Sequence, residues 1–221
     1  MANTPKTSFE KAKETFNLQF EEDDYVADVA DLNSGPFSAT TLEKYDIRTD
    51  GTLVLAADIP KGLTVHNISN YKQTSTLDSY LKEGRPLVLT FGSFSWRPWR
   101  QKSKVLTSMY EMYKSKVDFL AVYISEAHAT DEWKLYTDVC FKQPTTIEER
   151  VEVASKFATR LHGDMDLVID GMNNLCRDAF SSWPERLYII GKDGKVSDTF
   201  SSITKPSSQK FINLIEKEIK N

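Results

Sequence analysis

From Arg85 to its end, the chain alternates apolar runs of strand length with segments of helical period, and this order restricts the fold more than any other feature. Strands that alternate with helices are typical of parallel βαβ units. The turn Asp193-Gly194 then joins two further apolar runs as a hairpin, and an amphipathic helix follows. The predicted segments are strands 87–91, 119–124, 166–170, 186–191 and 195–200 and helices 99–115, 146–161 and 208–220.

This order is that of the thioredoxin fold, so we predict an α/β fold with a thioredoxin-like layered sheet and helices on both faces. Pro184 supports the prediction, because it lies just before strand 186–191, where thioredoxin-like folds carry a cis-proline that faces the active-site loop. A cis bond costs far less before proline than before other residues. An ordinary trans proline that opens a strand is the alternative.

The first third of the chain is expected to be an N-terminal extension, residues 1–74, packed on a core domain of residues 75–221. Phe9, Phe16 and Phe20 recur at helical spacing and indicate an amphipathic helix. The segments predicted in and after this extension are a helix over 8–20, a strand over 52–59 and a short helix over 76–84. None of them carries a recognisable chemical motif.

Charge and hydropathy exclude several classes of protein. The 221 residues hold 28 Lys and Arg against 32 Asp and Glu, for a net charge of −4, and no basic block could follow a phosphate backbone. No nucleic-acid partner is therefore expected. No apolar run approaches the roughly 20 residues that a membrane span needs, and the N-terminus lacks the apolar region of a signal peptide. These features predict a cytoplasmic protein without a membrane contact.

The two cysteines, Cys140 and Cys176, are far apart in the sequence and lack CxxC spacing. Neither a zinc site nor a resolving-cysteine motif is visible, so we expect no metal and no cofactor. Two free thiols fit a reducing compartment, although a disulfide between them stays open as an alternative.

Five blocks of the sequence resemble, in the same order, blocks of the iodothyronine deiodinases, which are thioredoxin-fold selenoproteins that reductively remove iodine from thyroid hormones. The blocks are RPLVLTFGS (85–93), YISEAHATDEW (123–133), ERVEVA (149–154), DGMNN (170–174) and PERLYII (184–190). The resemblance covers roughly residues 75 to 220. It implies the thioredoxin-like fold and a homodimer, since deiodinases pair as dimers.

The loop after the first strand of this region departs from the family at its catalytic position. In deiodinases the sequence FGS is followed by Cys, Thr and selenocysteine, and the selenocysteine attacks the iodine. Here these three positions hold Phe94, Ser95 and Trp96, and Arg97 replaces the next proline. An indole cannot exchange with a thiol or bond to iodine, because that chemistry requires a thiolate or selenolate. Pro144 also stands where the family carries a histidine assigned to proton transfer, so two parts of the redox reaction are missing.

The origin of Trp96 has two explanations at the level of the codon. Selenocysteine is read from UGA and tryptophan from UGG, so one base change accounts for a natural replacement. A UGA codon translated as tryptophan would give the same letter artificially. Because Phe94 and Arg97 also depart from the family, we favour a natural loss of the selenocysteine.

Three residues are candidate catalytic groups by the resemblance. Glu126 and His128 stand at the positions of the family's Glu and His near the hormone, and in an extended segment they would share a face. A histidine transfers protons near neutral pH, and a carboxylate can fix its tautomer. Arg186 corresponds to a family arginine near the active site, and its fork could hold a carboxylate, phenolate or oxyanion. The alternative for Glu126 and His128 is a hydrogen-bonded pair with a purely structural role. The alternative for Arg186 is a structural ion pair.

The residues expected to line a substrate site are Phe94, Ser95, Trp96, Trp133, Trp183 and Pro184. Aromatic surfaces with a few polar groups bind flat apolar ligands, so the tryptophans at these loops, with Trp99 beside them, could form a cleft. The alternative is that the indoles fill the vacated cleft and close it.

Three functions remain open. The first is a non-redox, cofactor-independent enzyme that acts on an aromatic or polycyclic small molecule by acid–base catalysis, as in isomerisation, cyclisation or elimination. The second is a non-catalytic binding protein for such a molecule. The third is a reductive dehalogenase or thiol oxidoreductase in which Cys176 or Cys140 has become the nucleophile.

Overall fold

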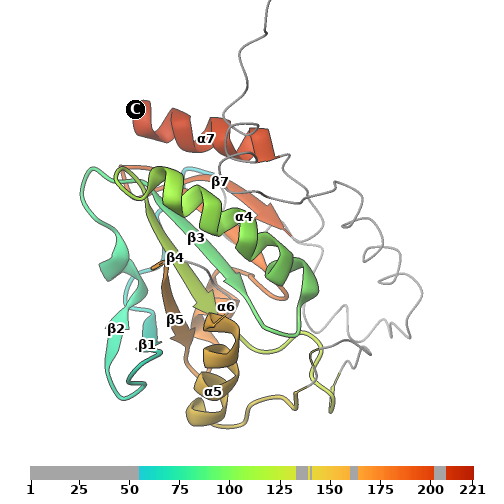
Figure 1. Cartoon of the computed structure of the whole chain (residues 1–221). Helices are drawn as coiled ribbons and strands as arrows, with labels where there is room; N and C mark the ends of the chain where they lie inside the picture. The colour runs from blue at the N-terminus through green and yellow to red at the C-terminus, as the bar shows by residue number, and fades with distance from the viewer. Residues whose placement is uncertain (1–54, 133–138, 140, 160–163, 202–207) are drawn as a thin grey trace, which may run out of the picture.

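The described residues form one mixed, seven-stranded sheet with the strand order β2-β1-β5-β4-β3-β6-β7. The computed structural model describes residues 55–132, 139, 141–159, 164–201 and 208–221 (Figure 1). The strands are β1 (Thr64–Asn67), β2 (Thr74–Thr76), β3 (Leu87–Gly92), β4 (Asp118–Tyr123), β5 (Asp166–Asp170), β6 (Arg186–Ile190) and β7 (Val196–Ser201). The helices are the 3₁₀ helix η2 (Leu77–Tyr80), α4 (Arg97–Tyr113), α5 (Ile147–Ala158), α6 (Leu175–Ala179) and α7 (Ser208–Lys220).

The three central strands are parallel, and the strands around them are antiparallel. β3 pairs with β4, and β4 pairs with β5, in parallel, which agrees with the two predicted βαβ units. On one side β6 and β7 follow as an antiparallel hairpin, and on the other β1 pairs antiparallel with β5 and β2 pairs antiparallel with β1. All residues of β3 are buried, so the core lies along the strand that leads to the FGSFSW loop.

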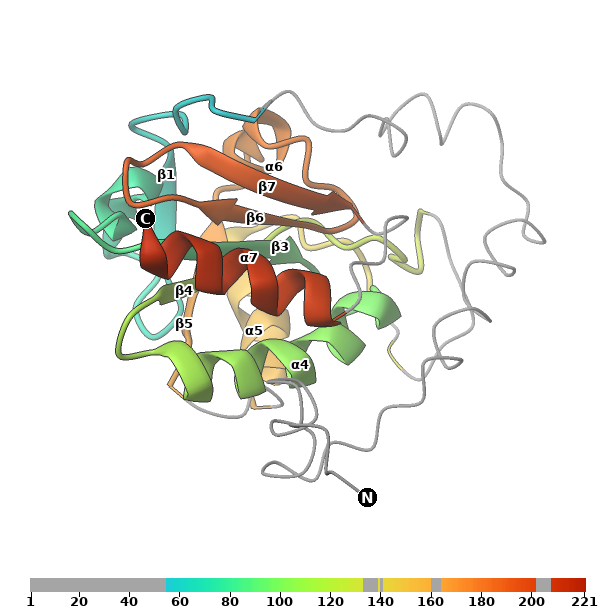
Figure 2. The same cartoon turned by 90° about the horizontal axis from the view of Figure 1, so that it is seen from above.

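Helices cover both faces of the sheet, as predicted. α4, α5 and α7 lie on one face and the short α6 on the other (Figure 2). On the first face the rings of Trp99 and Phe157 stack with centroids 4.2 Å apart, which joins α4 to α5. On the second face Phe180, which follows α6, packs on Phe91 of β3 at 4.8 Å. None of the described helices has both the length and the apolar character that a membrane span requires.

Local sequence explains where α4 and α5 begin. α5 starts at a capping box, in which the Thr146 hydroxyl accepts from the Glu149 N–H at 3.2 Å and the Glu149 carboxylate accepts from the Thr146 N–H in return. α4 starts at Arg97 and not at the predicted residue 99. Pro98 is tolerated there, because the first turn of a helix has no internal acceptor for its N–H groups.

The upstream segments differ from their predictions. The predicted helix over 76–84 is only the single turn η2, and the described part of the predicted strand 52–59 forms only an isolated bridge between Asp58 and Lys195. β1 and β2 were not predicted, because they are short and mostly polar strands in which Val65 is the one fully buried residue. β1 lies before residue 75, so strand pairing continues upstream of the expected domain boundary. The predicted helix over 8–20 lies outside the described residues.

Candidate functional site

Three segments meet at one end of the central strands and form the candidate site. The parallel strands β3 and β4 both end there, at Gly92 and Tyr123, and β6 begins there because it runs antiparallel to β3. Open α/β sheets bind their ligands at the carboxyl ends of the parallel strands. The Trp183-Pro184 peptide bond before β6 is cis, which confirms the prediction made for Pro184.

The FGSFSW loop and the SEAH loop after β4 are joined by hydrogen bonds. The Ser93 hydroxyl accepts from the backbone N–H of Ala127 at 3.2 Å. The Ser95 hydroxyl accepts from the backbone N–H of His128 at 3.1 Å. Both hydroxyl oxygens therefore connect the first loop to the backbone of the second.

Glu126 is the centre of this loop pair. Its carboxylate is 1% exposed, and it accepts from the Ser95 N–H at 2.9 Å and from the Tyr123 hydroxyl. The Tyr123 oxygen in turn accepts from the Phe94 N–H at 3.0 Å. Burial raises the pKa of Glu126, although the hydrogen bonds from Ser95 and Tyr123 oppose the shift. Both carboxylate oxygens are thus engaged by the protein itself.

His128 is 3% exposed, and its imidazole packs on the indole of Trp96 with centroids 5.2 Å apart and the rings tilted by 33°. Glu126 and His128 therefore both face the FGSFSW loop, but they contact different parts of it. Glu126 contacts the backbone and Tyr123, whereas His128 contacts the ring at position 96.

Trp96 is the N-cap residue of α4 and is 4% exposed. Among the described residues its Nε1–H has no hydrogen-bond acceptor. The indole, at the position that the resemblance gives to the nucleophile, therefore lies on the imidazole and retains one donor without an acceptor in the described part of the chain. This part of the site agrees with both alternatives for Trp96, a surface of a ligand cleft or a plug that fills it.

Trp99 is part of the core. Its Nε1–H donates to the Thr90 hydroxyl at 3.1 Å, and its ring lies directly over Gly92, where an added Cβ would approach the Trp99 Cδ2 to 2.2 Å. Phe94 is also buried, with its ring against Phe141 at 5.6 Å and Phe157 at 5.9 Å. The residue that replaces the family's cysteine therefore packs in an aromatic cluster between α4 and α5.

The sequence profile of the iodothyronine deiodinases matches residues 41–199 of the chain, which includes all three segments of the site. The chain belongs to the iodothyronine deiodinase family. It is 36% identical over 117 residues to the type I iodothyronine deiodinase of Xenopus laevis, a match that covers 53% of this chain and 46% of that protein. It is 35% identical over 120 residues to the thyroxine 5-deiodinase of Ovis aries, over 53% of this chain and 40% of that protein. The matches thus span less than half the length of these relatives.

Solved structures agree with the fold. This chain superposes on a candidate thiol:disulfide interchange protein, DsbE, from Chlorobium tepidum with a TM-score of 0.56 and 13% sequence identity. The superposition covers 76% of this chain and 99% of that one. A thioredoxin-like protein from Porphyromonas gingivalis superposes with a TM-score of 0.54 and 15% identity, over 76% and 95% of the two chains. The predicted thioredoxin-like fold is therefore confirmed.

Arg186 lies on the other face of the sheet from the Glu126 cluster of this deiodinase-family site. It pairs with Phe91 across the antiparallel ladder, so the two side chains share the α6 face. Glu185, one residue earlier, projects to the α4 face and forms an ion pair with Lys102. Trp183 is buried beside the cis bond, and Trp133 lies outside the described residues.

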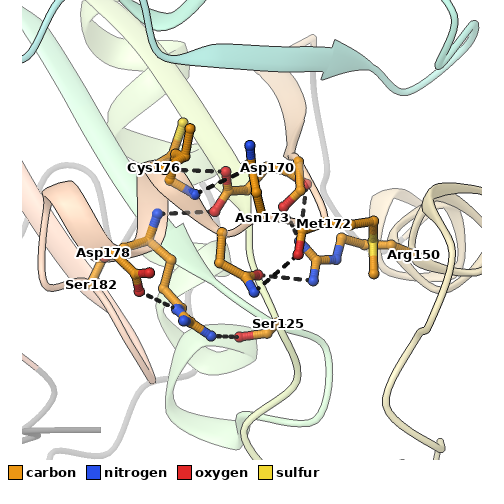
Figure 3. A network of polar contacts seen from close by, with 12 residues as sticks. Ser125, Arg150, Asp170, Met172, Asn173, Cys176, Asp178 and Ser182 are labelled. Carbon is orange, nitrogen blue, oxygen red and sulfur yellow. Dashed lines mark hydrogen bonds and ion pairs between the residues drawn. The ribbon is translucent and has the colours of Figure 1, made fainter.

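A second polar network lies where β5 ends (Figure 3). The buried Arg150 guanidinium donates to the carbonyls of Asp170 and Gly171 at 3.0 and 2.8 Å and to the Asn174 amide oxygen at 3.0 Å. The Asp170 carboxylate accepts from the backbone N–H groups of Cys176 and Arg177 at 3.1 and 2.9 Å. Sequence reasoning assigned Arg150, Asp170 and Asn174 no role, although ERVEVA and DGMNN are family blocks. The network fixes the turn between β5 and α6.

The same network makes Cys176 unreactive. The thiol is fully buried, and burial together with the neighbouring Asp170 carboxylate raises its pKa far above the usual value. A reactive cysteine needs a lowered pKa and access to solvent. Cys176 has neither, and Cys140 lies outside the described residues.

Proposed function

We propose that this chain has replaced the redox reaction of its family by proton transfer on an aromatic or apolar small molecule, without a cofactor. The observation that carries the proposal is the contact of the Trp96 indole with the His128 imidazole, at 5.2 Å between centroids, where the family places its selenocysteine. Isomerisation, cyclisation and elimination all need only a proton donor and acceptor beside the ligand.

The relatives named above are deiodinases, and the resemblance attributes their chemistry to a selenolate. An indole cannot supply that nucleophile, and Cys176 is buried as a neutral thiol. These two facts argue against the third function considered from the sequence, in which a cysteine takes over the reaction. They leave the imidazole as the group of the site that can exchange protons near neutral pH.

The proposal gives different roles to the three candidate catalytic residues. His128 is the acid–base group. Glu126 is a positioning residue, because its two oxygens hold the Ser95 N–H and the Tyr123 hydroxyl and so fix both loops around the imidazole. Arg186 receives no role in the proton transfer, since its side chain is on the α6 face.

A second candidate is a binding protein without catalysis. It is favoured by the near-complete burial of His128 and by the engagement of both Glu126 oxygens within the protein. In that case the same residues stabilise the loops and the ligand stays unchanged.

Turnover in the absence of a reductant separates the two candidates. An aromatic compound that raises the melting temperature of the wild type is incubated with the wild type and with His128→Ala, and the products are followed by mass spectrometry. Proton-transfer catalysis predicts a product of unchanged oxidation state that forms with the wild type and hardly with the variant. A compound that binds both proteins and is recovered unchanged from both would support the binding protein instead.

A further inference from the structure

The SEAH loop, which carries His128, lies between β4 and α5 and outside the ladder of the sheet, so its backbone groups need other hydrogen-bond partners. Its last two N–H groups donate to the hydroxyls of Ser93 and Ser95 in the FGSFSW loop. The backbone of Glu126 has a different partner, which is the side chain of Gln143. Neither the sequence nor the proposed function has so far given Gln143 a role.

Gln143 forms two hydrogen bonds to the backbone of one residue. The N–H of Glu126 donates to Oε1 of Gln143 at 2.9 Å, and Nε2 of Gln143 donates to the carbonyl of Glu126 at 3.1 Å. These partners fix the orientation of the amide, since in the opposite orientation its NH₂ group would face the N–H and its oxygen would face the carbonyl. The amide therefore pairs with Glu126 as the backbone of a neighbouring strand would.

Gln143 is itself anchored. Its backbone N–H donates to the Asp131 carboxylate at 2.9 Å, and its Nε2 also donates to the Glu132 carboxylate at 3.2 Å. Pro144 follows directly and is buried, and the residue before a proline favours an extended backbone. The amide of Gln143 is thus presented to the SEAH loop from a restrained position.

Glu126 is held at its side chain and at its backbone. Its carboxylate accepts from the FGSFSW loop and from the Tyr123 hydroxyl, and its backbone pairs with Gln143. His128 follows two residues later and lies on Trp96, with ring centroids 5.2 Å apart. Because the direction of the imidazole depends on the peptide planes that precede it, the pairing at Glu126 contributes to the contact between the two rings.

We propose that Gln143 is a positioning residue of this site, which holds His128 on Trp96 through its two hydrogen bonds to the backbone of Glu126. The inference rests on the proposed function in one respect, namely that the imidazole is the acid–base group. Position matters for such a group, since a displacement of about 1 Å can lower a rate roughly 10²-fold. The role requires an amide, because a carboxylate lacks the N–H that the Glu126 carbonyl accepts.

The contact between the imidazole and the indole can be followed by nuclear magnetic resonance without a ligand. The chain has three histidines, His66, His128 and His162, so isotope-labelled histidine gives three Cε1–H signals. His128→Gln identifies the signal of His128. The ring current of Trp96 should displace this signal, and Trp96→Leu measures the displacement by removing it. The displacement reports how closely the imidazole lies on the ring.

Two variants of Gln143 test the role. Gln143→Ala removes both hydrogen bonds, whereas Gln143→Glu retains the size but loses the N–H and places a carboxylate beside that of Glu132. In both variants the His128 signal should lose most of its displacement, while the signals of the other two histidines stay unchanged. Gln143→Glu retains the test if Gln143→Ala does not fold.

Two controls separate positioning from stability. Thr146→Ala removes the N-cap of α5 close to Gln143, so it should lower the melting temperature and leave the His128 signal in place. Gln209→Ala makes the same substitution on α7, where the amide donates to Asn213 at 2.8 Å, and should also leave the signal in place.

An unchanged His128 signal in the folded Gln143 variants would overturn the inference and leave the proposed function standing. A displacement that Thr146→Ala reduces as much would also overturn it, because a general loosening of the segment would then explain the effect. A loss confined to the Gln143 variants would establish that Gln143 positions the imidazole. If the protein then turned over no aromatic compound, the proposed function alone would fail.

Discussion

At position 96 an indole stands where, by the resemblance, deiodinases carry selenocysteine, and the proposed reaction depends on that exchange. The side chain that the indole contacts is His128, and the side chain that holds the backbone before the indole is Glu126. In a proton-transfer site His128 would react and Glu126 would hold the loops around it, so the two residues should respond differently to substitution.

His128→Ala should reduce turnover by roughly 10²–10⁴-fold, the usual effect of losing one general acid or base, while ligand affinity changes only a few-fold. The reason is that the imidazole transfers the proton in the transition state and contributes little to binding of the ligand in the ground state. Steady-state kinetics and calorimetry on the same ligand measure the two effects. Equal turnover by well-folded wild type and variant would remove His128 from the mechanism.

Glu126→Gln should change how stability depends on pH. The pKa of Glu126 is raised in the folded protein from its ordinary value of 4.5, chiefly by burial, so the folded state holds this proton to higher pH than the unfolded state. Stability linked to Glu126 therefore falls as pH rises from 4.5 through the raised pKa, and it is not recovered at higher pH.

The glutamine variant lacks this titration, so its free energy of unfolding should fall less than that of the wild type over that pH range. Urea unfolding at a series of pH values measures the difference between the two proteins. Asp170, whose pKa is also raised by burial, titrates in both and cancels in the comparison. Parallel curves for wild type and variant would show that Glu126 ionises normally in the folded state.

At the scale of elements, hydrophobic period and turn residues were sufficient to predict every described strand and helix from β3 to the C-terminal helix α7, with the exception of α6. Those segments are long, and their apolar residues recur with a clear period, as in the fully buried LVLTFG of β3. α6 was missed because it has only five residues and follows Asn174 in a left-handed conformation. Such a turn depends on hydrogen bonds from Arg150, which is distant in the sequence, and to Asp170, whose partners the sequence does not indicate.

The candidate site was predictable only in part, for a similar reason. Family motifs indicated Glu126 and His128, and the structure places both against the FGSFSW loop. The separation of Arg186 from them could not be seen in the sequence, because it depends on the register of β6 against β3, and a shift of one residue would reverse the face. The role of the Ser93 hydroxyl as an acceptor between loops likewise depends on three-dimensional contact.

The junction of β3 and α4 depends on Gly92, because the Trp99 ring covers it. A Cβ at this position would lie 2.2 Å from the Trp99 Cδ2. Gly92→Ala should therefore lower the free energy of unfolding by about 1–3 kcal/mol, the usual cost of overpacking a core, and lower the melting temperature. In a Trp99→Leu background the same substitution should cost much less, since the ring is absent. Equal costs in both backgrounds would show that Trp99 is not the obstacle.

At the scale of the whole molecule, a family fold is retained while the atoms that carried its chemistry are changed. The thioredoxin-like sheet, the cis bond before Pro184 and the SEAH loop are all present, yet the position of the nucleophile holds Trp96. A fold positions a site but does not determine the reaction, so membership of the family alone does not make this chain a deiodinase.

The prediction at this scale is that the purified chain releases no iodide from thyroxine above background when a dithiol is supplied. No described side chain at the site can form a chalcogen–iodine bond, because Trp96 fills the position and the Cys176 thiol is buried and held neutral. Iodide release is measured directly, with a curated relative such as the Xenopus laevis type I enzyme as the positive control.

A Cys140→Ser, Cys176→Ser double variant should retain the ligand binding of the wild type, because neither thiol occupies the family's nucleophile position. Dithiol-dependent iodide release that disappears in this double variant would establish a thiol reaction and replace the proton-transfer proposal.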